Sequence, residues 1–504
     1  MNDLRFAFRQ LLKNPGFSAV AVLTLAGFCH AEDGKPDFSS ARNLIQTQMV
    51  AKSIPAFSVA VVRRGEILWE EGFGWADREN RISATEHTPY YLASVSKTFT
   101  ATAVMILQER KQLDLDRPVN SYLGLDGMRS PRWDVKGATV RRVMTHTAGL
   151  TTFRRNYYPE QGERGISLGE AIRRYGIAFW PPGERFDYSN LGYAILGEMV
   201  ARASSRSYED FLRTEIFLPL GMTRASLGGA GLEKHVAKRY SSDHGLRPRI
   251  ESATPGASAI YCSAHDLANF GMFHLKAHPP SHKAILSDAS IDAMQISTVS
   301  TGDGLYGLGW DFHGYRSVLA QGGTDDASTW LRLVPSEGIA VVGLANTGTS
   351  LPSKVINEVL FKLLPAFREE SAKRGKELQS EKPLSGLPSS ELAGKWTGAI
   401  ATHRGNVPLL FSFTQSGDVH AKLGAQLTTL LNEAHYAKRR LTGKMAGDLG
   451  IPDETGPASY DLEFELFLRD GVLNGAVTTD SHASPLPGPA LPFWVELKKE
   501  TVQP

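Results

Sequence analysis

The first candidate for chemistry is a serine followed three residues later by a lysine, in Ser94-Val95-Ser96-Lys97. Apolar residues recur at helical spacing through Glu109, so we expect this pair at the start of a helix. Residues i and i+3 share a helix face, which brings the lysine amine within reach of the serine hydroxyl. A lysine with a depressed pKa can take the serine proton and so activate a nucleophile. Taken alone, the pair also fits an exposed helix start with a capping serine.

A second candidate is Tyr188-Ser189-Asn190, which precedes a helical pattern over residues 191–201. A tyrosine with its ordinary pKa of about 10 is a poor base at neutral pH. Beside a lysine ammonium its phenolate becomes accessible, and it can then shuttle the serine proton to a leaving group. The Asn190 amide can orient the lysine or hold a substrate carbonyl. By itself the segment equally fits a capping turn.

The third candidate is the glycine-rich segment Gln321-Gly322-Gly323-Thr324, which follows a strand-like run. Glycines at a sheet edge let a substrate lie along the strand. The Thr324 N–H could then join the Ser94 N–H in an oxyanion hole. A glycine turn between two strands is the alternative.

A fourth segment, Gly165-Ile166-Ser167-Leu168-Gly169, matches the GxSxG nucleophile elbow. That elbow needs a buried strand before it and a helix after it. The preceding residues 156–164 are typical of a loop, so we expect the nucleophile at Ser94 and not at Ser167.

The elements that must position these segments indicate an α+β chain. One hairpin begins at residues 58–62 and another spans residues 329–345, with helical patterns between them. We therefore expect one antiparallel sheet built from both ends of a domain, flanked by helices and joined to a helical subdomain.

The C-terminal part of the chain has a different pattern. Arg368 to Lys382 is charged and nearly without large apolar residues, which is typical of a linker. Beyond it, leucines and phenylalanines alternate with polar residues over 462–468, and Asp470-Gly471 is a hairpin turn. The sequence predicts a signal peptide at 1–31, a main domain at 32–365, a linker at 366–390 and a small antiparallel β-barrel-like domain at 391–504.

Residues 1–31 have the pattern of an export signal. Arg5, Arg9 and Lys13 supply a positive start, and residues 17–28 form an apolar run too short to cross a bilayer comfortably. We expect a periplasmic or secreted protein. The alternative is a retained N-terminal segment that associates with the membrane or anchors the protein there.

Composition narrows the classes of function. The 504 residues are 42% hydrophobic and 21% charged, which fits two or three globular domains. The net charge is +2 and no Lys/Arg stripe is present, so nucleic acid is not an expected partner. Histidines are scattered without a metal-binding pattern, and we expect no metal or organic cofactor.

Taken in order, SxxK, YxN and a glycine-rich strand resemble the class C β-lactamase and penicillin-binding protein superfamily, which includes family VIII carboxylesterases and D-aminopeptidases. The resemblance covers roughly residues 40–365. Its supporting segments are YLASVSKTFT at 91–100, THTAGL at 145–150, PPGERFDYSN at 181–190 and YGLGW at 306–310. The C-terminal segment is similar to the lipocalin-like modules appended to some members.

The resemblance implies a serine hydrolase with Ser94 as nucleophile, Lys97 and Tyr188 as its activating pair, and substrate-binding residues Asn190, Gln321, Gly323 and Thr324. It also places His146 in a family signature, where we expect a structural role. Hydrolysis would pass through an acyl-enzyme formed with a small ester, amide or peptide. A short-chain ester, a D-amino-acid peptide of the cell wall and a β-lactam remain open as substrates.

Gln321 departs from the pattern, because the family usually carries Lys or His there. Glutamine hydrogen-bonds but brings no charge, so carboxylate-bearing substrates such as β-lactams should bind less well. The same departure motivates a rival hypothesis, a catalytically weak binder of peptidoglycan or peptides.

Overall fold

The computed structural model describes residues 36–124, 127–302, 304–315, 317–378, 391–415, 417–451, 460–480 and 488–500. The predicted signal at 1–31 lies outside these residues. No helix within the described ranges is both long and apolar enough to span a bilayer.

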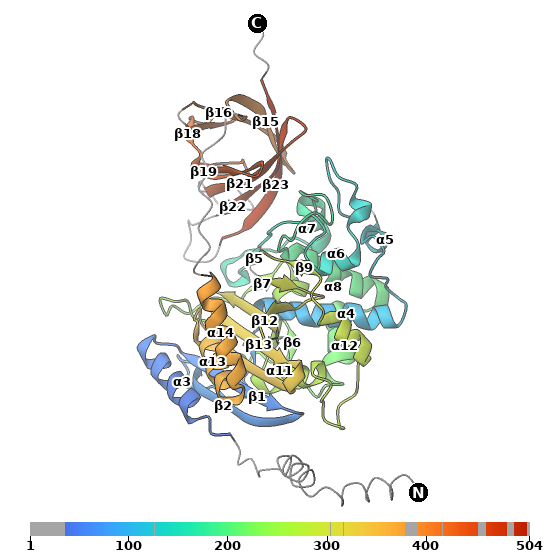
Figure 1. Ribbon diagram of the computed structural model, residues 1–504, viewed down its shortest axis with the longest axis vertical. Helices are drawn as coiled ribbons and strands as arrows, with labels where there is room; N and C mark the ends of the chain where they lie inside the picture. Colours follow the sequence, from blue (N-terminus) through green and yellow to red (C-terminus); the bar gives the residue numbers. More distant parts are fainter. Residues whose placement is uncertain are drawn as a thin grey trace, which may run out of the picture. The chain divides into compact units, whose positions relative to one another are not determined.

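Within the described residues, nine strands form one antiparallel sheet in the order β3-β2-β1-β14-β13-β12-β11-β10-β9. The strands are β1 (Ala56–Arg63), β2 (Glu66–Asp77), β3 (Ile82–Ser83), β9 (Val299–Ser300), β10 (Leu305–Tyr306), β11 (Asp311–His313), β12 (Ser317–Thr324), β13 (Ala327–Val334) and β14 (Ile339–Ala345). Strands β1 and β14 pair in register from Phe57↔Ala345 to Arg63↔Ile339. Figure 1 shows the blue N-terminal strands beside the yellow strands of this sheet. The prediction of a sheet built from both ends of a domain is confirmed.

Helices pack on both faces of this sheet. Gly271 of α11 (Ala264–His274) lies against Ala340, whereas Pro352 of α13 (Leu351–Leu363) lies against Gly343. Residues 340 and 343 point to opposite faces because side chains alternate along a strand. Strand β14 is therefore buried throughout its length.

The helical part centres on α4 (Ser96–Glu109), which packs against α8 (Asn190–Ser204) and the short helix α10 (Pro255–Ser258). Helix α4 carries an almost continuous run of buried side chains from Ser96 to Leu107. Such a helix is enclosed on all sides, which makes it a rigid base for the residues at its N-terminus.

Shorter elements connect these layers. Helices are α3 (Ser39–Ala51), α5 (Asn120–Leu123), α6 (Val140–Met144), α7 (Leu168–Tyr175), α9 (Tyr208–Leu212) and α12 (Asp288–Met294). Strand β8 (Ile260–Cys262) pairs with both β4 (Tyr90–Tyr91) and β6 (Ser226–Leu227), and β5 (Asn156–Tyr157) pairs with β7 (Glu251–Ser252).

Part of the predicted linker is helical. Residues 366–378 belong to α14 (Pro365–Leu378), which contacts α13, and residues 379–390 lie outside the described ranges. The segment is rich in Glu, Lys, Arg and Ala, which favour helix even without an apolar face. Phe367 anchors it, since its ring is buried and lies 5.8 Å from that of Phe361.

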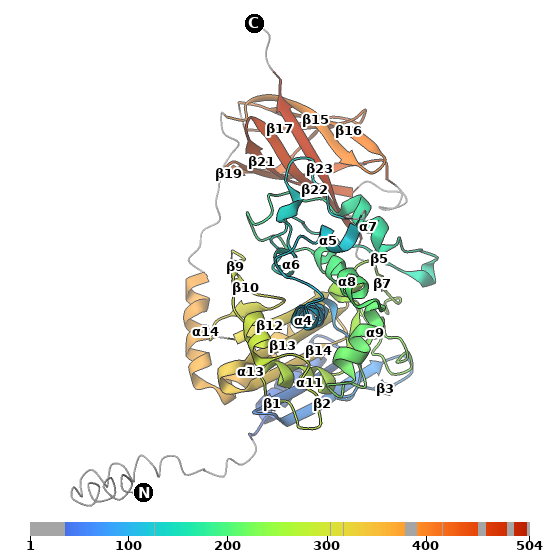
Figure 2. The ribbon, with the colours of Figure 1, turned by 90° about the vertical axis from the view of Figure 1, so that its right-hand side faces the viewer.

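Nine strands of the described C-terminal residues form a second antiparallel sheet in the order β18-β17-β16-β15-β23-β22-β21-β20-β19 (Figure 2). Strand β18 also contacts β20, so the sheet curls into a nearly closed barrel, as predicted. The strands are β15 (Gly394–Thr402), β16 (Gly405–Phe413), β17 (Val419–Leu423), β18 (Thr429–Leu430), β19 (Asn432–Ala437), β20 (Arg440–Gly447), β21 (Tyr460–Arg469), β22 (Val472–Asp480) and β23 (Ala490–Lys499).

Candidate active site

Ser94 lies in a tight turn immediately before α4, not in the helix itself. Residues Ala93–Val95 form a 3₁₀ turn, and Ala93 has φ of +46°. A left-handed alanine is unfavourable by itself, so its surroundings must hold it. The Leu92 carbonyl accepts a hydrogen bond from Thr329 Oγ1 at 2.7 Å, and the Leu92 N–H donates to the Ile260 carbonyl at 2.8 Å. These contacts from β13 and β8 fix a partly exposed serine at the helix entrance.

Lys97 is buried beside that serine, with 2% of its surface exposed. Its Nζ lies 3.0 Å from Ser94 Oγ, 2.8 Å from Asn190 Oδ1 and 3.1 Å from the Ala257 carbonyl oxygen. Burial lowers the pKa of Lys97 to about 7, and the nearby Asp311 carboxylate opposes that shift. A lysine in this setting is substantially neutral at physiological pH.

Tyr188 approaches Ser94 from the loop before α8. Its hydroxyl donates to Ser94 Oγ at 2.8 Å, and Lys97 Nζ lies 4.7 Å from the centre of its ring. Desolvation raises the pKa of the Tyr188 hydroxyl above its ordinary value, and the Ser94 hydrogen bond only partly offsets this. The expectation of an accessible phenolate is therefore not what the electrostatics favour, because desolvation and the nearby Asp311 carboxylate both raise the pKa of the tyrosine.

His146 fixes the backbone on either side of Tyr188. Its carbonyl accepts from the Asp187 N–H at 2.8 Å, and its Nδ1 accepts from the Ser189 N–H at 3.1 Å. The ring lies 4.5 Å from the Tyr188 ring, and burial holds its pKa well below the usual range, so the imidazole is neutral. These contacts are structural in kind, as expected for this residue.

Asn190 is the first residue of α8, and Ser189 caps the helix by accepting from the Gly192 N–H. The Asn190 Nδ2 donates to the Phe153 carbonyl at 3.1 Å. That contact turns the amide oxygen toward Lys97.

The glycine-rich segment lies at the end of β12. Gly322 packs directly on the nucleophile turn, because a Cβ there would lie 2.3 Å from the Leu92 carbonyl oxygen and 2.7 Å from the Ser94 nitrogen. Gln321 and Gly323 are exposed, and Thr324 is half-buried. The alternation of a strand thus turns residues 321 and 323 away from the face that touches the Ser94 turn.

A buried ion pair supports the end of β12. Arg239 contacts the Asp326 carboxylate with only 4% and 3% of the two side chains exposed. Asp326 Oδ1 in turn accepts from the Thr324 hydroxyl at 2.5 Å. The pair fixes the turn between β12 and β13.

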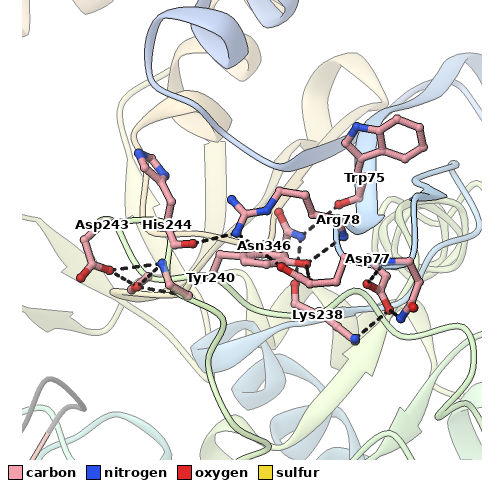
Figure 3. Close-up of polar contacts among 12 residues, drawn as sticks. Trp75, Asp77, Arg78, Lys238, Tyr240, Asp243, His244 and Asn346 are labelled. Atoms are coloured by element: carbon pink, nitrogen blue, oxygen red, sulfur yellow. Dashed lines mark hydrogen bonds and ion pairs between the residues drawn. The ribbon is translucent and has the colours of Figure 1, made fainter.

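Polar contacts hold Lys238 and Tyr240, the two neighbours of Arg239 in the chain, in place (Figure 3). Asn346 Nδ2 donates to the Lys238 carbonyl at 2.9 Å, and its Oδ1 accepts from the Ala56 N–H at the same distance. The Tyr240 hydroxyl accepts from the Arg78 N–H at 2.8 Å and donates to Glu79 at 2.6 Å. The segment 238–240 is thereby attached to the ends of β1, β2 and β14.

Ser167 lies elsewhere and has a different structural role. It is exposed and caps α7 by accepting a hydrogen bond from the Glu170 N–H. The two-residue strand β5 and a 3₁₀ turn at Pro159–Gln161 lie upstream, but residues 163–166 directly before Ser167 are a loop, so the strand-to-helix elbow is missing.

The sequence interpretation missed three contributors. The Ala257 carbonyl contacts Lys97 through its backbone, which no side-chain pattern reveals. Asp311 acts on Lys97 electrostatically. The YGLGW motif that precedes Asp311 could have indicated this, because its Gly309 packs on α4: a Cβ there would lie 2.5 Å from Ala101. Gly322 was predicted only as one of the glycines that let a substrate lie along the strand, and not as a residue packed on the Ser94 turn. Among the described residues no cluster of three or more His, Cys, Asp or Glu side chains suits a metal ion.

The chain is similar to known proteins over much of its length. The Beta-lactamase family model matches residues 41–361. Unguisins hydrolase ungD' of Aspergillus campestris is 30% identical over 339 residues, which cover 61% of this chain and 62% of that protein. The chain spans less than two thirds of the length of the first curated relatives that it matches.

Two solved structures share the fold. The octameric penicillin-binding protein homologue from Pyrococcus abyssi is 22% identical, with a TM-score of 0.57 over 92% of this chain and 100% of that one. A class C β-lactamase is 21% identical, with a TM-score of 0.55 over 64% of this chain and 95% of that one.

Proposed function

This chain belongs to the Beta-lactamase family, a family of serine hydrolases, and we propose that it hydrolyses an ester or amide bond through an acyl-enzyme on Ser94. The observation that carries the proposal is the convergence of two proton-handling groups on one oxygen. Lys97 Nζ and the Tyr188 hydroxyl lie 3.0 and 2.8 Å from Ser94 Oγ. Serine needs such neighbours to attack a carbonyl at neutral pH.

Lys97 is the base in this proposal. A neutral amine has two N–H donors and one lone pair, and Asn190 and Ala257 supply the two acceptors. The lone pair then faces Ser94. Because Tyr188 donates to Ser94 Oγ, the serine's own hydrogen is free to point at Lys97. The base and the nucleophile are thus oriented before substrate arrives.

In the first step Ser94 Oγ bonds to the substrate carbonyl carbon, the serine proton moves to Lys97, and the carbonyl electrons move to oxygen. The N–H groups of Ser94 and Thr324 are the proposed oxyanion donors. When the bond to the leaving group breaks, Tyr188 gives that group a proton and is reprotonated at the expense of Lys97. In the second step water gives a proton to the same pair as its oxygen bonds to the acyl carbon. The bond between that carbon and Ser94 Oγ then breaks, the pair returns the proton to Ser94 Oγ, and the acid is released.

Neutral esters are the proposed substrate class. Exposed Gln321 at the β12 edge offers an amide where a charged side chain would attract a carboxylate. A panel of a nitrophenyl ester, D-amino amides and nitrocefin tests this preference. Turnover of D-amino amides above the ester would support a peptidase instead, and turnover of none would support a binding protein.

A fluorophosphonate probe tests the nucleophile. We expect the probe to label the protein on the peptide that contains Ser94, and Ser94→Ala to abolish labelling while the circular dichroism spectrum is unchanged. A label found on Ser167 would contradict the proposal.

A further inference from the structure

The outer face of barrel strand β21 is covered where it meets the segment that carries Tyr188. Along β21 the residues Leu462, Phe464, Leu466 and Leu468 are buried inside the barrel. The alternate residues Glu465, Phe467 and Arg469 therefore point outward. Each of these three contacts the segment from Trp180 to Arg185.

Charge pairs join the two segments. Arg185 Nη1 lies 2.6 Å from Glu465 Oε1 of the barrel. In a second pair the barrel supplies the positive charge, since Arg469 contacts Glu184. Glu465 also accepts from Arg440 of the adjacent strand β20 at 2.6 Å, which fixes the carboxylate in place. The Arg185 and Glu465 side chains are only 27% and 22% exposed, so solvent screens this pair less than a fully exposed one.

An aromatic contact at Trp180 extends this interface between the two segments. Trp180 has no exposed surface, and its ring lies 5.3 Å from that of Phe467 in an edge-to-face arrangement. Its ring also abuts Gly475 of β22, where a Cβ would lie 3.0 Å away. The Arg185 guanidinium covers the Trp180 ring at 4.8 Å. The barrel thus fixes the position of the indole from several sides.

The same indole holds the residue before the catalytic tyrosine. Trp180 Nε1 donates to Asp187 Oδ2 at 2.6 Å, and Asp187 is bonded to Tyr188. His146 fixes the backbone of this loop but makes no hydrogen bond with the Asp187 carboxylate. Asp187 also pairs with Arg185 at 4.0 Å and accepts a hydrogen bond from Thr151. Its carboxylate is therefore held by Thr151 together with Trp180 and Arg185, and the last two contact the barrel.

We propose that the barrel positions Tyr188 for catalysis, with Glu465, Arg185 and Trp180 as positioning residues. The inference rests on the proposed function of Tyr188. A displaced loop lengthens the distance from the tyrosine hydroxyl to Ser94 Oγ, and proton transfer is sensitive to that distance. Substrate binding along β12 does not involve these residues, so the effect falls on kcat and not on KM.

Glu465→Gln tests the proposal, with Glu463→Gln as its matched control. Glu463 lies two residues away on the same strand and pairs with Lys444 of the barrel at 2.9 Å. We expect Glu465→Gln to lower kcat for the nitrophenyl ester, and the rate of fluorophosphonate labelling, by about tenfold at unchanged KM, the factor expected for one charge-assisted contact. Glu463→Gln should match the wild type, and Glu465→Asp should restore part of the loss.

A double-mutant cycle separates positioning from general stability. If one contact transmits the effect, Arg185→Gln should reproduce the loss, and the double variant should be no slower than either single variant. Arg185→Gln leaves the barrel sequence unchanged, so it tests the same contact if Glu465→Gln does not fold.

Three results would overturn the proposal. The first is a Glu465→Gln protein with a lowered Tm but with wild-type kcat and labelling rate. The others are a loss of kcat in Glu463→Gln equal to that in Glu465→Gln, and a double variant whose loss of kcat is the product of the two single losses. Failure of the wild type to be labelled at Ser94 would instead overturn the proposed function on which this inference rests.

Discussion

The two antiparallel sheets of this protein differ in the burial of their two faces. Every residue of β14 is buried, since helices α11 and α13 pack on its two sides. In β21 burial alternates strictly, because only the barrel interior is filled by side chains. The main sheet and the helices packed with it can therefore hold reactive groups in a desolvated setting, as the buried Lys97 of α4 shows. The barrel keeps one face available for contacts such as those of Glu465 and Phe467.

The largest expected effects lie beside the main sheet. Lys97→Ala and Tyr188→Phe should each lower turnover of a nitrophenyl ester by at least about 100-fold, the usual loss of a general acid or base. Steady-state kinetics check this, with circular dichroism as the control for folding. Near-normal turnover in either variant would remove that residue from the mechanism.

Core truncations sharpen the comparison of faces. Ile339→Ala and Leu344→Ala lie on opposite faces of β14, and both side chains are fully buried. Each should cost about 2–5 kcal/mol of unfolding free energy. In β21 the inward Leu466→Ala should cost a similar amount, whereas the outward Glu463→Gln should stay within about 0.5 kcal/mol.

Urea unfolding of the four variants gives these values. A large loss for Glu463→Gln, or a small one for either β14 variant, would show that burial does not separate the two sheets in this way.

The desolvation of Lys97 predicts a pH dependence. Since burial lowers its pKa to about 7, the neutral form that acts as base increases as pH rises through that value. The acylation rate should therefore rise by about tenfold from pH 6 to pH 8 and then level off. Stopped-flow acylation with a non-ionisable ester measures it, and Ser94→Ala supplies the background rate. A flat profile over this range would contradict a lysine base.

The smallest effect is expected at the exposed edge of the main sheet. Gln321→Lys should improve acylation by a β-lactam by up to about tenfold, because a charge-assisted hydrogen bond contributes about 1.5–3 kcal/mol against about 1 kcal/mol for a neutral one, and about 1.4 kcal/mol is one decade. Hydrolysis of a small neutral ester should change little. Nitrocefin hydrolysis by the natural protein at the rate of its best ester would refute the argument from lost charge.

Local patterns predicted much of the fold. Alternation over 462–468 and the Asp470-Gly471 turn predicted β21 and β22, and the two hairpins near residues 60 and 335 predicted one sheet. These features depend on periodicity and turn chemistry, which a short window of sequence contains. The helix α14 within the predicted linker was not predicted, because its sequence has no apolar periodicity and its buried Phe367 is a single residue.

For the site, neither Ser94-x-x-Lys97 nor Tyr188-x-Asn190 was enough alone, but their order together with the family resemblance nominated four side chains that the structure brings together. The pKa values were not accessible in the same way. Whether Lys97 is charged depends on how completely α8, α10 and β11 exclude water around it, and those elements are distant in sequence. The same holds for the Ala257 carbonyl, a backbone group that any residue type would supply.

The sequence by itself determined which side chains are available for chemistry and which faces of each element are apolar, since both follow from residue type and local spacing. The tertiary structure decided the protonation states, the close approach of Gly322 to Ser94 and the contact of Glu465 with Arg185. Each of these depends on desolvation or on distances between segments far apart in the chain, and such quantities exist only once the chain has packed.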